Sequence, residues 1–106
     1  MRFNVHVMPI ATRELDHIIA WVADRSPSGA ARLLGRFHQS LKSLETNPHR
    51  HGIAPESELV GREIRQMFFK TRKGRTYRAL FDIHDDLVRV LHVRGPGQDL
   101  IDPEDW

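Results

Sequence analysis

Apolar residues recur at two different spacings along the first half of the chain. Phe3, Val5 and Val7 alternate with polar residues, which predicts a short strand at residues 3–7 that ends before Pro9. A helical spacing follows, and its apolar face consists of Ala11, Leu15, Ile18, Ile19 and Val22. A second helical face consists of Ala30, Leu33, Leu34, Phe37, Leu41 and Leu44.

The break between the two helical segments is short. Ser26 followed by Pro27 is typical of a helix N-cap and the first turn behind it. Asn47-Pro48 is expected to stop the second helix. Two helices joined by so short a break predict an antiparallel helical hairpin.

Residues 48–61 read as a loop, because Pro48, Gly52, Pro55 and Gly61 punctuate them. The loop is long for a small domain, which suggests a functional or mobile segment. A single helical turn at residues 56–59 would fit within it.

Three strand patterns follow at residues 63–69, 76–83 and 87–94, separated by polar turns at 70–75 and 84–86. Strand, turn, strand, turn, strand predicts an antiparallel meander. The third strand is apolar on both faces, which favours a central position in the sheet. Gly95-Pro96-Gly97 ends it, and Asp102-Pro103 is a candidate start for one further turn.

The predicted order is β-α-α-β-β-β, an α+β fold with the helical hairpin packed on one face of the sheet. A length of 106 residues suits one compact domain spanning residues 1–106.

Composition narrows the classes of function. The chain has no cysteine, which excludes disulfides, thiol catalysis and cysteine zinc sites. It has no apolar run of membrane-spanning length and no secretion signal, so a cytoplasmic protein without a membrane partner is the expectation. Its seven histidines match no metal-ligand spacing, and no nucleotide loop is found, so we expect neither metal nor cofactor.

Charge is distributed unevenly along the chain. Residues 61–94 carry nine Lys/Arg and four Asp/Glu, a net charge of +5, whereas residues 95–106 carry four acidic residues and no Lys/Arg. One interpretation is that the basic segment docks an anionic partner. The other is a solvated sheet edge that its charges protect against aggregation.

Strand alternation identifies the candidate working face. Arg78 must point away from Tyr77, Ala79 and Phe81, so it would lie on an open face if those residues cover the helices. Guanidinium groups on such a face can grip phosphates, and the candidates to join Arg78 are Arg65, Arg89 and Arg94.

Other residues add candidate contacts to nucleic acid. The turn at residues 70–75 contributes the cations Lys70, Arg72, Lys73 and Arg75. Phe68 and Phe69 are adjacent, so one must face outward, where it could stack on a base, as could Tyr77. His92 is the candidate acid or base, and its alternative is a packed, hydrogen-bonded strand residue.

The sheet sequence resembles the RelE/ParE toxins of type II toxin–antitoxin systems over residues 3–97. The resemblance is carried by Glu63-Ile64-Arg65-Gln66-Met67, Thr76-Tyr77-Arg78-Ala79-Leu80-Phe81-Asp82-Ile83 and Val88-Arg89-Val90-Leu91-His92-Val93-Arg94. The helical hairpin fits the same family. The resemblance implies a toxin that inhibits growth and a cognate antitoxin that neutralises it.

The family resemblance leaves two targets open. RelE-like members cut mRNA on the ribosome, and in them the arginine matching Arg78 stabilises phosphate charge, while Arg65 matches a basic strand position. ParE-like members poison DNA gyrase instead. Met67 and Gln98 stand where the nuclease would have a lysine and an arginine, and the acidic tail lacks a Tyr or His.

A third hypothesis is therefore a non-catalytic or degenerate member that only binds nucleic acid or protein. In that case the acidic tail at residues 99–106 could fold back and screen the basic sheet.

Overall fold

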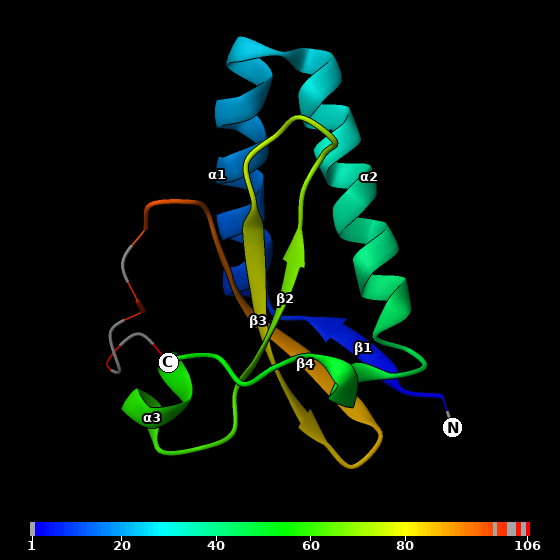
Figure 1. Cartoon of the computed structure of the whole chain (residues 1–106), viewed down its shortest axis with the longest axis vertical. Helices are drawn as coiled ribbons and strands as arrows, with labels where there is room; N and C mark the ends of the chain where they lie inside the picture. Colours follow the sequence, from blue (N-terminus) through cyan, green and yellow to red (C-terminus); the bar gives the residue numbers. More distant parts are fainter. Residues whose placement is uncertain (1, 99, 102–103, 105) are drawn as a thin grey trace.

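The computed structural model describes residues 2–98, 100–101, 104 and 106. Its two long helices are α1 (Pro9–Arg25) and α2 (Pro27–Ser43), each with proline in its first turn. Ser26 separates them, and its Oγ accepts a hydrogen bond of 3.0 Å from the backbone N–H of Gly29. This N-cap begins α2 directly where α1 ends, so the two helices form the predicted hairpin (Figure 1).

The sheet has four strands in the order β1-β4-β3-β2. The antiparallel meander consists of β2 (Arg65–Phe69), β3 (Tyr77–His84) and β4 (Leu87–Arg94), as predicted. The N-terminal strand β1 (Asn4–Val7) pairs in parallel with β4. The predicted central position of β4 is confirmed, because β1 and β3 lie on either side of it.

The main core lies between the helical hairpin and one face of the sheet. Phe37 of α2 meets Phe69 of β2 with ring centroids 5.2 Å apart, and Phe69 stacks on Tyr77 of β3 at 5.8 Å. Phe81 is fully buried in the same cluster. Tyr77 and Phe81 therefore do face the helices, which leaves Tyr77 unable to stack on a base. Phe68, 59% exposed, is the outward member of its pair.

The opposite face of the sheet is covered in part, and Phe68 lies outside this cover. A short helix, α3 (Glu56–Val60), follows the one-turn helix η1 (Pro48–Arg50) in the connection to β2. A second apolar cluster forms here from Ala54, Ile64, Leu80 and Ile101. The C-terminal segment therefore returns to α3, where Figure 1 shows the chain end.

A register shift in β4 gives both faces their apolar residues. Leu80 pairs with His92 while the next residue, Phe81, pairs with Val90, so Leu91 is the extra residue of a bulge. Val88, Val90 and Val93 consequently all belong to the main core. Both faces of β4 are apolar for two reasons. The strand is central in the sheet, and the bulge at Leu91 changes which residues point to each face.

Most predicted boundaries differ from the observed ones by only a few residues. The helical turn expected at residues 56–59 is α3, and the turn expected at Asp102-Pro103 lies outside the described residues. No helix formed by the described residues is both long and apolar enough to cross a membrane.

Candidate functional site

Arg78 points away from the helical hairpin, as alternation predicts, but the face it enters is not open. Its guanidinium binds the carboxylate of Glu56 in α3 through both oxygens, with Nη1–Oε1 at 2.8 Å and Nη2–Oε2 at 2.5 Å. The side chain of Arg78 is 16% exposed and that of Glu56 is fully buried. The expectation of an open working face at Arg78 is therefore wrong, because α3 covers it.

Glu56 is surrounded by donors. Its Oε2 accepts a hydrogen bond of 3.3 Å from the backbone N–H of Ile101, whose side chain is buried in the second cluster. Burial raises the pKa of the Glu56 carboxyl, but the hydrogen bonds from Arg78 and from backbone N–H groups, together with the charge of Arg78, outweigh it and leave the pKa lowered. Glu56 is thus held as an anion that matches Arg78.

Arg65 also makes structural contacts. Its Nη1 donates to the backbone oxygen of His51 at 2.5 Å and to that of His49 at 3.1 Å, and its Nε donates to Glu63 at 2.9 Å. The side chain is 18% exposed. Arg65 therefore links the segment before α3 to the start of β2. It is not free to bind a phosphate.

His92 is buried, with 3% of its surface exposed. Its Nδ1 lies 3.1 Å from Oε1 of Glu14 in α1, and the same oxygen accepts the backbone N–H of Val93 at 3.0 Å. Its ring also meets the Trp106 ring edge-on at 4.6 Å. Glu14 thereby caps the edge of β4 beyond the end of β1. His92 is a packed, hydrogen-bonded strand residue, which was the alternative to a role as acid or base.

Arg89 and Arg94 also lie in β4. Arg89 binds Asp82 of β3 with Nε–Oδ1 at 2.9 Å, and Arg62 binds the same carboxylate. The hydrogen bond and charge of Asp82 raise the pKa of Arg89, more than offsetting burial. Arg94 lies opposite Arg78 in the strand register. The register thus brings Arg78 and Arg94 together but not the other predicted sheet cations, because Arg65 pairs with Phe81 on the helix side and Arg89 pairs with Asp82, four positions from Arg78. Arg65, Arg78 and Arg89 are all occupied by protein partners.

The cations of the β2–β3 turn are placed differently. Lys70, Arg72, Lys73 and Arg75 are all exposed, and none of them makes an ion pair with a described residue. The turn lies beside the connected ends of α1 and α2 (Figure 1).

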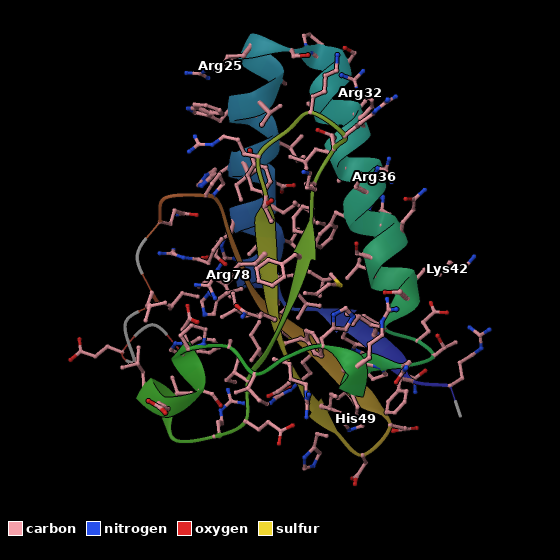
Figure 2. All side chains as sticks on the ribbon, in the orientation of Figure 1. Arg25, Arg32, Arg36, Lys42, His49 and Arg78 are labelled. Atoms are coloured by element: carbon pink, nitrogen blue, oxygen red, sulfur yellow. The ribbon has the colours of Figure 1, made fainter. Side chains whose placement is uncertain are left out.

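Between the turn and α2 is a groove of about 770 Å³ whose cationic lining residues are Arg32, Arg36, Arg72, Lys73 and Arg75. We call it the cationic groove. Figure 2 shows Arg32 and Arg36 on successive turns of α2. Sequence reasoning missed these two arginines, although their spacing of four residues on the polar side of α2 was a usable signal.

A second feature missed from the sequence is the exposed aromatic residue of α1. Trp21 is 53% exposed, and the guanidinium carbon of Arg25 lies 3.6 Å from its ring centroid. A smaller hollow of about 380 Å³ lies beside it, lined also by His17, Tyr77 and Pro96. An exposed indole next to a hollow suits contact with another protein.

These contacts favour binding over proton-transfer chemistry. Arg78 is paired with Glu56 and His92 with Glu14, whereas the five cations of the cationic groove make no ion pair with a described residue and lie at the connected end of the hairpin. Within the described part of the chain, no group of three or more His, Asp or Glu side chains could hold a metal ion.

A protein-family model matches most of the chain. The model described as the ParE toxin of the type II toxin–antitoxin system parDE matches residues 5–100. A comparison with curated proteins gives no significant match.

Proposed function

Because the chain belongs to the ParE toxin family of type II toxin–antitoxin systems, we propose that it inhibits growth by poisoning DNA gyrase, without cleaving RNA. Membership of the family implies a cognate antitoxin that neutralises it. The cytoplasm, where gyrase acts on DNA, is the proposed location, and residues 1–106 are the proposed toxin domain.

The observation that carries the choice of target is the pairing of Arg78 with Glu56. Cleavage of RNA through its 2′-hydroxyl requires a cation that meets the extra charge on the phosphate in the transition state. The Arg78 guanidinium already neutralises a carboxylate, and the cover formed by α3 and Ile101 separates it from a substrate. Reaching a phosphate would require breaking a bidentate ion pair with a fully buried partner.

The second requirement of an RNA-cleaving site is a group that transfers a proton at the reacting atoms. His92 is the candidate, and its ring is held between Glu14 and Trp106 with little exposed surface. With its Nδ1 held by Glu14 and only 3% of its surface exposed, His92 is poorly placed to reach a 2′-hydroxyl. Inhibition by protein contact needs neither group and is compatible with the exposed Trp21 and Arg25 on α1.

The proposed target is tested by expressing the chain from an inducible promoter without its antitoxin. We expect growth to stop, stalled gyrase–DNA cleavage complexes to accumulate, and purified gyrase to lose supercoiling activity when the chain is added. Primer extension on ribosome-bound mRNA should show no cuts that depend on induction.

Two outcomes would contradict the proposal. Induced mRNA cuts without gyrase complexes would identify a RelE-like nuclease, in which case the cover over Arg78 must open on the ribosome. Normal growth at verified expression would identify the degenerate, non-inhibitory binding module. Co-expression of the short protein encoded by the neighbouring gene tests the antitoxin, which should restore growth.

A further inference from the structure

We propose that the cationic groove binds the phosphate backbone of duplex DNA without reading its sequence. Five cations from two separate elements line one concave surface, Arg32 and Arg36 from α2 and Arg72, Lys73 and Arg75 from the β2–β3 turn. No described lining residue is acidic, and none of the five makes an ion pair with a described residue.

The charge of the groove is therefore available to a ligand, in contrast to that of the sheet. Arg62, Arg65, Arg78 and Arg89 all meet carboxylates of the protein itself. Converging cations that lack internal partners raise the local potential and attract polyanions. The groove thus holds Arg72, Lys73 and Arg75, three cations of the basic segment that make no ion pair with a described residue.

The residue types favour phosphate as the anion. Four of the five groove cations are arginines, whose planar forks match two phosphate oxygens at once. Arg32 and Arg36 lie about one helical turn apart, so they can contact different phosphates along one backbone. Repeated, evenly spaced phosphates fit this arrangement.

The lining also favours a duplex over a single strand. Proteins that hold single strands stack the bases on exposed aromatic rings. The one aromatic residue in the described lining is Tyr77, which is buried and stacked against Phe69. With no platform for unpaired bases, the groove is suited to backbone contacts alone.

The choice of DNA over RNA rests on the proposed function, since gyrase acts on duplex DNA. A groove that holds DNA would keep the toxin near the segment on which gyrase works. The groove is lined mainly by α2 and the turn, with Val22 from α1, and the exposed Trp21 is not part of this lining and is left for protein contact.

The test measures binding of the full chain, freed of antitoxin, to a fluorescently labelled DNA duplex by anisotropy over about 50–200 mM salt. The variant is Arg32→Gln/Arg72→Gln, and the matched control is Arg13→Gln/Lys42→Gln, which removes the same charge from exposed positions outside the groove. Equal thermal melting of both variants and the parent verifies folding.

We expect the groove variant to bind at least about tenfold more weakly at low salt and to reduce the slope of log K against log salt by about 1.8, because each lost phosphate contact removes about 0.9. The control should bind like the parent, and Arg32→Lys/Arg72→Lys should keep most of the slope.

Equal losses in the groove variant and the control overturn the proposal, because binding would then follow net charge. Tighter binding to duplex RNA or to polyglutamate than to DNA also overturns it, and would assign the groove to RNA or to an acidic protein segment. Gyrase poisoning without DNA binding removes this inference and leaves the proposed function. DNA binding without gyrase poisoning removes the proposed function and leaves the groove as a DNA-binding site.

Discussion

Arg78 of β3 and Glu56 of α3 are 22 residues apart in the chain, and they meet through two hydrogen bonds on the covered face of the sheet. The arginine that strand alternation and family resemblance both single out is therefore a link between two structural elements. Its charge is matched by a carboxylate that has no solvent exposure.

Breaking the pair on one side should destabilise the fold strongly. Arg78→Ala leaves a buried carboxylate without its cation, and Glu56→Ala leaves a largely buried guanidinium, so each should lower the free energy of unfolding by about 3–5 kcal/mol. Urea unfolding measures both. Glu56→Met/Arg78→Met should cost much less than the sum of the losses from Glu56→Met and Arg78→Met, and additive losses would show that the residues are not coupled.

The same double variant separates structural from catalytic roles in growth inhibition. If Arg78 acts only through the fold, Glu56→Met/Arg78→Met should still stop growth when its expression matches that of the parent. Arg78→Ala should lose inhibition in proportion to the loss of folded protein. A double variant that folds but fails to inhibit growth would assign Arg78 a direct role at the target.

Local patterns predict the elements of this fold well. Period-two alternation locates the meander, and the spacing of Ala11, Leu15 and Ile18 locates α1. The caps explain why: Ser26 and Pro27 determine the start of α2 through contacts within four residues. Contacts between residues so close in the chain can be predicted from the local sequence.

The cover on the second face could not be predicted in the same way, because it depends on long-range contacts. Glu56 reaches the sheet from the short helix α3, and Ile101 and Trp106 reach it from the tail, and none of the three belongs to a periodic pattern that would place it. One signal was available. Leu80 alternates to the face opposite Phe81, and a buried leucine there requires a second apolar layer.

Stability should fall in acid because of Glu56. The pKa of its carboxyl is below the ordinary value of 4.5, so the unfolded chain takes up this proton more readily than the folded one. The stabilisation is complete above pH 4.5 and is lost as the pH falls through the lowered pKa of the folded state. Urea unfolding on both sides of pH 4.5 should show this slope, and Glu56→Gln should flatten it; an equal slope in the variant would assign the acid sensitivity to other groups.

His51 should add a separate loss of stability at mildly acidic pH. Burial, and then the charges of Arg50 and Arg65, lower its pKa below 6.5, and its ring meets Phe81 edge-on at 5.8 Å. The unfolded chain therefore binds the proton first, so the free energy of unfolding should be fully retained above pH 6.5 and decrease as the pH falls below it.

His51→Phe keeps a ring against Phe81 and removes the titration, so its unfolding free energy should change less over this range. His84→Gln, at a side chain 81% exposed, is the matched control and should keep the slope of the parent. Identical slopes in the His51 variant and the parent would show that His51 does not cause the loss.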